Sequence, residues 1–337
     1  MAEVQARAET GTPAGGRIAI LTNSKAVELL TDDAGAVEGV VADSHGIATP
    51  FRARNVLITT GGYPANPWLF EDYVGAPMYI MESYAHCKGG GIVMAEAIGA
   101  ALRGRDLHRP GSGSILTSDT YPATVYARFD TRPQKRLPWE IWVNDFGARF
   151  VNEETENRSA REQALMGQPR LRYSIVFDNA IFQAAPPGIP RWSRDDMAAH
   201  FNTQMMFKKA DTLDELARLL KVDPAGLAAS VAAYNAGIES GTDDPFGRGH
   251  RPLPIAQAPF YGIVQHGHSA TSSVGITVDG NLQALRADGT PIPNLYAAGE
   301  AIGSGATLGN AFVPGMMITP AMTLGRYLGE TIPFAKT

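Results

Sequence analysis

Residues 294–309 read NLYAAGEAIGSGATLG, an apolar stretch that ends in a glutamate and a series of glycines. The start of this stretch has the apolar character and the length of a buried β-strand. Glycine at positions 303, 305 and 309 allows a tight turn in which backbone N–H groups can come close to a ligand. The stretch therefore predicts a strand that is followed by a ligand-binding turn.

A second strand with a glycine-rich end lies early in the chain. The segments RIAILTN, AVELLTD, VEGVVAD and NVLITT have strand-like lengths and are separated by the turns DDAG and SHG. They predict a small β-meander that begins near Arg17 and returns to one buried strand, which ends in Thr59-Thr60-Gly61-Gly62-Tyr63. Glycine at a strand end permits close approach of the backbone to another group.

The middle of the chain alternates strand and helix patterns. GGGIVMAEAIGAAL, from Gly89, has helical apolar spacing, and WEIWVNDFGARFVNE predicts two strands around a turn at residues 145–147. SAREQALM again has helical spacing. Two further helices are expected after the N-caps Thr212 and Asp223, the second with Pro224 at its first position. Strands follow in FYGIVQ and GITVD, and an apolar helix is expected around MMITPAMTLGRYLG.

Composition limits the possible functions. A chain of 337 residues predicts two domains, or one domain with a large insertion. The net charge of −5 shows no basic excess for nucleic acid or an anionic membrane, and no apolar run is long enough to span a bilayer. Cys87 is the single cysteine, which excludes an internal disulfide framework. The first 16 residues lack the apolar core of a signal peptide, so we expect a cytoplasmic protein.

The ordered set of motifs resembles the FAD-dependent oxidoreductase 2 superfamily, which contains fumarate reductases, flavocytochromes c and 3-ketosteroid dehydrogenases. The resemblance covers nearly the whole chain from Arg17. Its specific part is the order of seven motifs along the sequence: the TGG strand end, Gly89-Gly90-Gly91, RFVNE (149–153), the VAAYN helices, PFYG (259–262), NLYAAGE (294–300) and the glycine-rich tail.

The resemblance implies an α/β fold with a discontinuous, partly Rossmann-like FAD-binding domain and an inserted α+β cap over the substrate. The expected parts are residues 1–75 and 265–337 for the FAD-binding domain and residues 76–264 for the cap. The family opens with a strand, a Gly-x-Gly-x-x-Gly turn and a helix that hold the FAD pyrophosphate, and this unit has no counterpart here. We therefore expect a member that lacks the unit, and the expected protein partner is a companion chain that carries it.

The resemblance also indicates cofactor-binding residues. Glu300 lies where the family uses an acidic residue to accept hydrogen bonds from the ribityl hydroxyls of FAD. Thr60, Gly61 and Gly62 correspond to a second cofactor contact, where a side chain would block the nucleotide. The turn after Glu300 would direct backbone amides at the flavin N1–O2 edge. The residues expected to form it are Gly305, Thr307, Leu308, Gly309 and Asn310.

The resemblance suggests two catalytic residues. Arg158 follows RFVNE where fumarate-reducing members carry the arginine that delivers a proton, but its spacing differs by one residue, which leaves Arg161 as an alternative. An arginine acts as part of a proton relay or as a fixed charge, because its own pKa is so high. Surface pairing of Arg158 with a nearby glutamate is the competing interpretation. His108 lies where those members place a substrate-binding histidine, although a lone loop histidine is often structural.

Other residues carry weaker signals. His266 and His268 alternate along a predicted strand and should project to one face, and His268 is a third catalytic candidate, although the family position aligns near Ala270 or Thr271. The His-x-His spacing lacks further ligands, so no metal site is predicted. The turn Gly111-Ser112-Gly113 lacks the Gly-x-Ser-x-Gly pattern of a hydrolase elbow.

The predicted function is oxidation or reduction of a CH–CH bond next to a carbonyl or carboxylate by hydride transfer at flavin N5. The substrate is a small molecule whose identity stays open. Thr307 replaces the second substrate arginine of the fumarate reducers, Gly90 replaces the acid of their GDG turn, and the Tyr-Pro-Gly of the steroid dehydrogenases is absent. The rival hypothesis is a non-catalytic fragment or subunit of a split flavoprotein that does not bind FAD alone.

Overall fold

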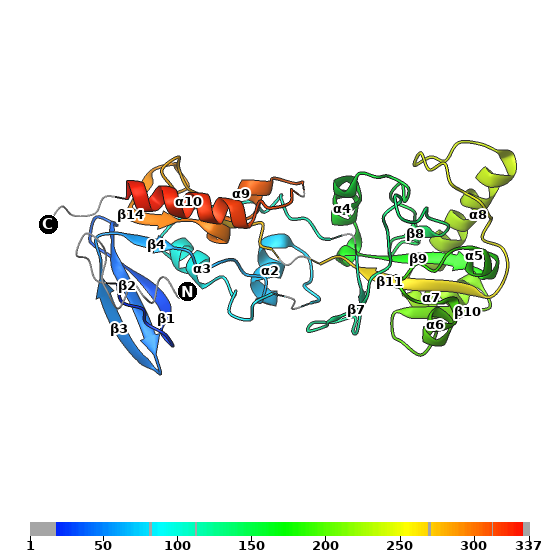
Figure 1. Cartoon of the computed structure of the whole chain (residues 1–337), viewed down its shortest axis with the longest axis horizontal. Helices are drawn as coiled ribbons and strands as arrows, with labels where there is room; N and C mark the ends of the chain where they lie inside the picture. Colours follow the sequence, from blue (N-terminus) through cyan, green and yellow to red (C-terminus); the bar gives the residue numbers. More distant parts are fainter. Residues whose placement is uncertain (1–17, 81–82, 112, 269–270, 312, 333–337) are drawn as a thin grey trace.

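The computed structural model describes residues 18–80, 83–111, 113–268, 271–311 and 313–332. The chain forms an elongated molecule with two units at its ends, joined by crossing segments near its middle (Figure 1). The first unit contains both ends of the described chain, and the second contains most of its middle. The mixed α/β class predicted from the sequence is confirmed.

The first unit begins with an antiparallel sheet. Its strands are β1 (Lys25–Thr31), β2 (Val37–Ser44) and β3 (Ile47–Arg52), in the order β1-β2-β3. This arrangement confirms the predicted meander. The prediction of an additional strand in RIAILTN is wrong for the described residues 18–23, which form no strand. Several of these residues are exposed, so no burial supports extended pairing there.

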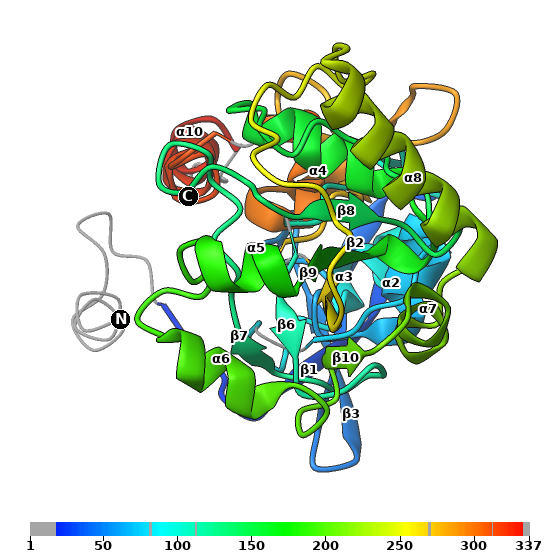
Figure 2. The ribbon, with the colours of Figure 1, turned by 90° about the vertical axis from the view of Figure 1, so that its right-hand side faces the viewer.

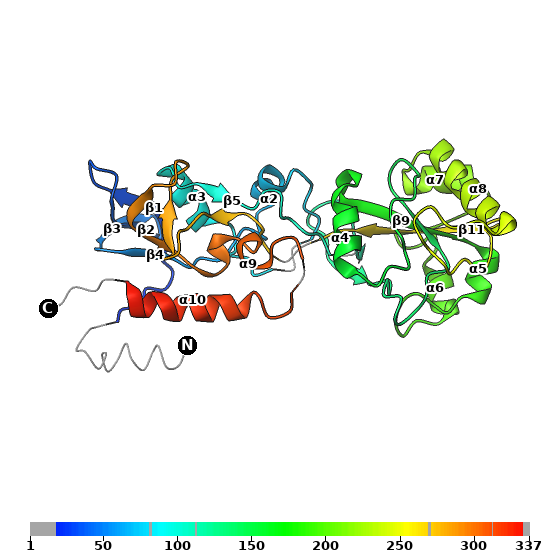
Figure 3. The same cartoon turned by 90° about the horizontal axis from the view of Figure 1, so that it is seen from above.

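The predicted glycine-ending strands pair with each other. β4 (Val56–Ile58) runs parallel to β14 (Pro291–Ala297), and β13 (Gln283–Leu285) pairs antiparallel with the other edge of β14. α3 (Gly90–Ala97) contributes buried residues to the same hydrophobic core, and α10 (Ile318–Thr331) lies along one side of the unit (Figure 3). Two segments more than 230 residues apart in the sequence thus form one parallel pair.

The second unit is built on a four-stranded antiparallel sheet in the order β10-β11-β9-β8. Helices α7 and α8 lie on one side of this sheet and α5 and α6 on the other (Figures 2 and 3). Aromatic side chains such as Phe177, Phe182 and Tyr261 stack within its core. The strands are β8 (Ile141–Val143), β9 (Arg172–Asp178), β10 (Phe207–Ala210) and β11 (Phe260–His266).

The predicted helix caps are confirmed in this unit. The Thr212 hydroxyl accepts from the amide of Glu215 at the start of α7 (Leu213–Leu220). The Asp223 carboxylate accepts from the amide of Gly226 at the start of α8 (Pro224–Ser240), and Pro224 occupies the first helical position. Such side chains satisfy amides that have no partner within the helix.

Two predicted elements end early. The helix from Gly89 stops at Ala97 because Gly99 takes a φ of +89°, and Leu102–Arg103 instead forms β5, paired with β12 (Gly275–Ile276). The prediction of a second strand after the turn at residues 145–147 is also wrong. Beyond β8 only a bridge between Val143 and Arg149 forms, because the Asn144 side chain accepts from two amides of the turn and holds it in place.

The sequence pattern did not reveal α2 (Pro67–Val74), where Asn66 caps a helix that has Pro67 at its first position. The remaining elements are short or connect the two units. They are β6 (Ile115–Leu116), β7 (Val125–Ala127), α4 (Arg158–Met166), the 3₁₀ turn η1 (Pro169–Leu171), α5 (Asn179–Ala184), α6 (Arg194–His200), the 3₁₀ turn η2 (Gly299–Ile302) and α9 (Gly305–Leu308).

Candidate functional site

The carboxyl ends of β4 and β14 meet at one edge of the first unit. Ile58 is paired with Ala297 in parallel register, and the Ala298 amide donates to the Ile58 carbonyl at 3.1 Å. Residues 60–62 and residues 299–300 therefore leave the sheet at the same edge. Ligands of open α/β sheets bind outside the carboxyl ends of the strands, so this edge is the place expected for a cofactor.

Ser272 connects these two segments. The Tyr63 amide donates to Ser272 Oγ at 2.7 Å, and the Ser272 amide donates to Glu300 Oε1 at 2.6 Å. A Cβ added at Gly62 would lie 2.1 Å from Ser272 Oγ and 3.1 Å from Glu300 Oε1. Glycine is therefore required at position 62 because of contacts within the chain, whether or not a nucleotide also approaches it.

The Glu300 carboxylate has the properties of an acceptor for ligand hydroxyls. Burial raises the pKa of Glu300, while the hydrogen bonds from Ser272 oppose the shift. No salt bridge to Glu300 occurs among the residues that the structure describes. Gly61, with a φ of +73°, and the exposed Thr60 lie in the neighbouring segment, and Cys87 Sγ is 3.5 Å from the place of a Cβ at Gly61. An uncompensated carboxylate beside an open glycine backbone fits the ribityl chain of FAD.

The turn after Glu300 uses its amides within the chain. The Ser304 amide donates to the Ser272 carbonyl at 2.7 Å and the Gly305 amide to the Ser273 carbonyl at 3.2 Å. The amides of Thr307, Leu308 and Gly309 donate to backbone carbonyls of the same turn. These hydrogen bonds form the short helix α9. In this structure these amides therefore stabilise the turn. An amide could contact the flavin only if it gave up its hydrogen bond to a backbone carbonyl.

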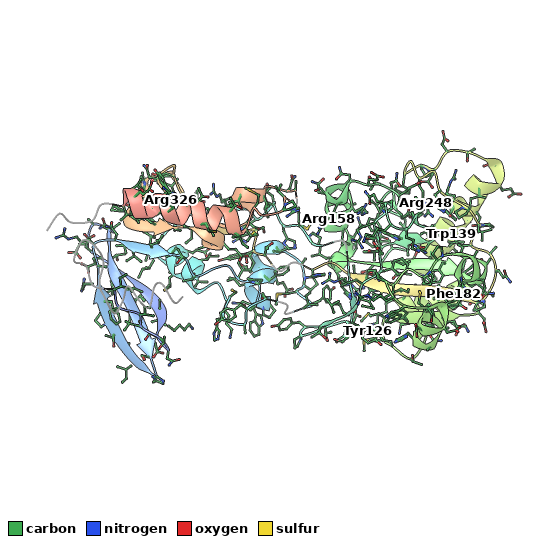
Figure 4. All side chains as sticks on the ribbon, viewed as in Figure 1. Tyr126, Trp139, Arg158, Phe182, Arg248 and Arg326 are labelled. Carbon is green, nitrogen blue, oxygen red and sulfur yellow. The ribbon has the colours of Figure 1, made fainter. Side chains whose placement is uncertain are left out.

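A cleft separates the end of this turn from α4 of the second unit. Gln163 Nε2 donates to the Asn310 carbonyl at 3.1 Å across the two units. A cavity of about 340 Å³ lies beside this contact, and Figure 4 shows Arg158 on the side of the second unit that faces the first. Residues from both units line the cavity, among them Arg109, Arg158, Glu162, His268, Thr271 and Leu308.

The Glu162 carboxylate forms ion pairs with two arginines that line the cavity. Its Oε1 lies 2.6 Å from Arg158 Nε and its Oε2 lies 3.4 Å from Arg109 Nη1. The side chain of Glu162 is 2% exposed, whereas that of Arg158 is 50% exposed. The structure thus pairs the half-exposed Arg158 with Glu162, a glutamate four residues further along α4. Two guanidinium groups therefore share the Glu162 carboxylate.

Arg161, the alternative to Arg158, lies one helical turn further along α4. It is 4% exposed, and its Nη1 donates to the Thr155 carbonyl. Burial lowers the pKa of Arg161. Arg161 lines a second cavity of about 360 Å³ that shares Arg158 and His268 with the first. The structure thus places both candidate arginines on one continuous cleft.

His108 is in a different environment. It is 3% exposed and contacts the Phe70 ring edge-on, with 5.1 Å between ring centres. Burial lowers the pKa of His108 to about 4, so the imidazole is neutral at pH 7. It lines neither cavity of the cleft. The structure therefore brings Arg158 and His268 together but leaves His108 in the packing of the first unit.

The two histidines at the end of β11 also differ. The strand ends at His266, so its alternation does not extend to His268. His266 is fully buried, and its Nε2 lies 2.8 Å from Asp119 Oδ1, while His268 lines both cavities of the cleft. No group of three metal-binding side chains occurs in the described part of the chain. Ala270 and Ser112 lie outside the described residues.

Sequence reasoning did not identify Ser272, Arg109 or Glu162. Glu162 had a detectable signal, because it follows Arg158 by four residues on a predicted helix, which is the spacing of a salt bridge. Ser272 and Arg109 reach the site only through the tertiary fold.

Comparison with known proteins identifies the family. A family model described as an FAD binding domain matches residues 2–311. The chain belongs to the FAD-dependent oxidoreductase 2 family. The members of this family are flavin-dependent oxidoreductases, and FAD is their cofactor.

Three members illustrate the relationship. The chain is 30% identical to a probable fumarate reductase of Shewanella frigidimarina over 91% of its own length and 49% of that protein. It is 31% identical to 4-oxocyclohexanecarboxylate 2-dehydrogenase of Sinomonas cyclohexanicum over 89% of its length and 54% of that protein. The crystal structure of 3-ketosteroid Δ1-dehydrogenase from Sterolibacterium denitrificans shares the fold, with a TM-score of 0.65 and 24% identity over 92% of this chain and 59% of that one.

The chain spans about half the length of the curated family members that it matches. Within the described residues, every helix is too short or too polar to cross a membrane.

Proposed function

We propose that the chain is the flavin-side and substrate-cap part of an FAD-dependent oxidoreductase that reduces or dehydrogenates a CH–CH bond next to a carbonyl or carboxylate. One observation carries the proposal. The cleft that contains Arg158 is also lined by Leu308, from the turn beside the Glu300 edge. A substrate in the cleft would therefore contact both a fixed positive charge and the segment nearest the cofactor edge.

The proposed domain division follows from the sequence. The FAD-binding part comprises residues 1–75 and 265–337 and the cap residues 76–264. The packing supports a cap with its own core, because the aromatic-rich cluster contains buried residues from Ile115 to Val264. α3 packs with β4 and β14, which favours assigning this helix to the FAD-binding side of the boundary.

The residues proposed to hold FAD are those at the shared strand edge. Glu300 would accept from ribityl hydroxyls and Gly61 would let the cofactor approach the backbone. When bound, FAD supplies the hydride donor or acceptor for one substrate carbon. The other proposed contacts are Thr60, Gly62, Gly305, Thr307, Leu308, Gly309 and Asn310.

Arg158 is the proposed catalytic residue of the cap. Its Nε is committed to Glu162, so it would contact the substrate through its Nη nitrogens. There it would hold a carboxylate or carbonyl oxygen and polarise the neighbouring carbon, at which a proton is exchanged. Glu162 would keep the guanidinium in place, and His268, at the junction of the two cavities, would hydrogen-bond the substrate.

A second candidate function is a flavoprotein part that binds FAD only together with a nucleotide-binding unit. Leu57 on β4 is 41% exposed, and on α10 Ile318 and Met322 are 71% and 72% exposed. Exposed apolar side chains on a parallel strand and a neighbouring helix suit a partner that adds a further α/β layer. Such a unit would supply the helix N-terminus that binds the pyrophosphate.

The first test is flavin retention. The purified chain is mixed with FAD, passed over a desalting column and examined for the visible absorbance of flavin. Retained flavin that Glu300→Gln reduces supports the first function. A colourless protein that gains flavin only with an added nucleotide-binding unit supports the second.

The second test concerns Arg158. Arg158→Ala should abolish reduction of an enoate such as crotonate while flavin remains bound, because the anchoring charge is lost. Arg326→Ala is the matched control, since Arg326 Nε pairs with Glu330 Oε1 at 2.9 Å in the same i, i+4 arrangement but on α10 (Figure 4). Turnover that persists in Arg158→Ala removes this residue from the mechanism.

A further inference from the structure

Tyr126, His200 and the Asp196 carbonyl form a chain of two short hydrogen bonds on the second unit. Tyr126 lies on β7 and is 42% exposed, and His200 is the last residue of α6. The His200 Nε2 atom lies 2.6 Å from the Tyr126 hydroxyl oxygen, and its Nδ1 atom lies 2.6 Å from the Asp196 carbonyl oxygen. Figure 4 shows Tyr126 at the lower edge of the second unit, separated from Arg158. Neither Tyr126 nor His200 lines a cavity of the cleft.

The Asp196 carbonyl decides the roles of the two ring nitrogens. A carbonyl oxygen only accepts hydrogen bonds, so His200 Nδ1 carries the hydrogen that it donates to Asp196. In the neutral ring Nε2 then has a free lone pair, and the Tyr126 hydroxyl donates to it. A phenol is therefore hydrogen-bonded to a base, and a third group orients that base, which is the arrangement of an activated side chain.

Aromatic contacts hold the histidine beside the tyrosine. The half-buried Trp192 packs on the His200 ring, with 4.3 Å between ring centres and 31° between the planes. Phe207 stacks on Trp192 at 5.9 Å, and the Tyr126 ring contacts Trp192 edge-on at 6.2 Å. Such ring pairs stabilise a structure beyond the area that they bury. The phenol, the imidazole and the indole therefore form one packed cluster, which the exposed phenol opens to solvent.

We propose that Tyr126 is a one-electron oxidation site, at which a radical oxidant such as nitrogen dioxide removes an electron while the phenol proton passes to His200 Nε2. The phenol O–H bond breaks, an N–H bond forms on the imidazole, and nitrogen dioxide gains the electron and becomes nitrite. The products are a phenoxyl radical and an imidazolium whose Nδ1–H still donates to Asp196. A positioned base accelerates such a step because it receives the proton as the electron leaves. The inference goes beyond the proposed function, since it involves neither the cleft nor flavin.

Tyr84 provides a matched comparison within the same chain. It is 72% exposed, more than Tyr126, and its ring lies 5.1 Å from the His86 ring. No hydrogen bond joins the Tyr84 and His86 side chains, both of which the structure describes. Exposure alone therefore predicts more oxidation at Tyr84, whereas a bonded proton acceptor predicts more at Tyr126.

Nitration by peroxynitrite, which supplies nitrogen dioxide radicals, tests the site. The phenoxyl radical combines with a second nitrogen dioxide at the ring carbon next to the oxygen, and the ring proton displaced there restores the hydroxyl, so the product is nitrotyrosine. Peptide mass spectrometry of the treated full chain measures the initial nitration of each tyrosine. We expect nitration of Tyr126 to exceed that of Tyr84 by about tenfold, the rate factor of one hydrogen bond to a developing charge. Equal nitration of the two tyrosines, or more at Tyr84, would overturn the proposal.

Variants separate proton acceptance from packing. His200→Gln keeps an amide oxygen that can accept the phenol hydrogen bond but cannot take up its proton, so nitration of Tyr126 should fall to the level of Tyr84. His86→Gln is the matched control and should leave nitration of Tyr84 unchanged. The comparison of the two tyrosines in the unaltered chain decides the question even if His200→Gln does not fold. Undiminished nitration of Tyr126 in folded His200→Gln would also overturn the proposal.

Discussion

Two arginines close to each other in the sequence have opposite surroundings. Arg149 and Arg158 each pair with a glutamate four residues later, Glu153 and Glu162. Arg149 also binds Asp244 at 2.6 Å, so one guanidinium faces two carboxylates and its side chain is 6% exposed. Arg158 instead shares its carboxylate with Arg109 and is 50% exposed.

The comparison teaches that burial among carboxylates, rather than spacing, separates a structural arginine from a candidate ligand-binding one. Around Arg149 two carboxylates balance two guanidinium groups, because Arg248 also pairs with Glu153 at 3.5 Å, and Glu153 Oε1 additionally accepts from the Trp142 amide. Around Arg158 the pairing is partly solvent-exposed, and Glu162 is shared with Arg109. The RFVNE motif (149–153) therefore stabilises the second unit, while Arg158, five residues after its end, lines the cavity.

The largest expected effect is that of Arg149→Ala. The change would leave Glu153 and Asp244 buried without their main counter-charge, which costs about 3–5 kcal/mol when a buried pair is broken. The free energy of unfolding of the second unit, from urea titration of the chain, measures this loss. A decrease below about 1 kcal/mol would show that Arg149 is no more structural than an exposed arginine.

His108, a buried titratable group whose Nε2 has no hydrogen-bond partner among the described residues, extends the comparison. The pKa of His108 is lowered by burial from 6.5 to about 4, so the unfolded chain binds more protons than the folded one between these values. Stability contributed by neutral His108 is complete above pH 6.5 and is lost as the pH falls toward 4, by about 3 kcal/mol. Urea unfolding of the first unit at pH 7 and pH 5 measures the slope, which His108→Phe should flatten. An unchanged slope in His108→Phe would assign the pH dependence to other groups.

The smallest effects are expected at the exposed arginines. Arg158→Ala should lower the free energy of unfolding by about 1 kcal/mol, because Glu162 retains Arg109. Arg326→Ala should change it by less than about 0.5 kcal/mol, since both members of that pair are exposed. Thermal and urea unfolding of the two variants provide the values. If Arg158→Ala lowers the free energy of unfolding as much as Arg149→Ala does, the two arginines contribute equally to stability and the comparison fails.

Local signals in the sequence predicted much of the fold. Thr212 and Asp223 were identifiable as caps because their function depends only on the next three residues. The helix that ends at Ala97 and the missing strand after Asn144 depended on a positive φ and on side-chain hydrogen bonds that periodicity does not reveal. The pairing of β4 with β14 was likewise invisible to local patterns.

The candidate site was only partly predictable. Arg158, His268 and Leu308 were all named from the sequence, and the fold brings them to one cavity. His108 has the residue type of a ligand-binding group, yet its environment is decided by burial against Phe70. Ser272 was missed because its contacts with Tyr63 and Glu300 join segments far apart in the chain.

The pairing of β4 with β14 also bears on how such proteins diversify. The first unit continues through α2 and α3 after β4 and resumes with β12 and β13 before β14, so the second unit is inserted between two segments of the first that this strand pair joins. The buried cores of the two units share no residue. We therefore expect that the second unit can be exchanged at two junctions while the sheet edge that carries Glu300 is kept.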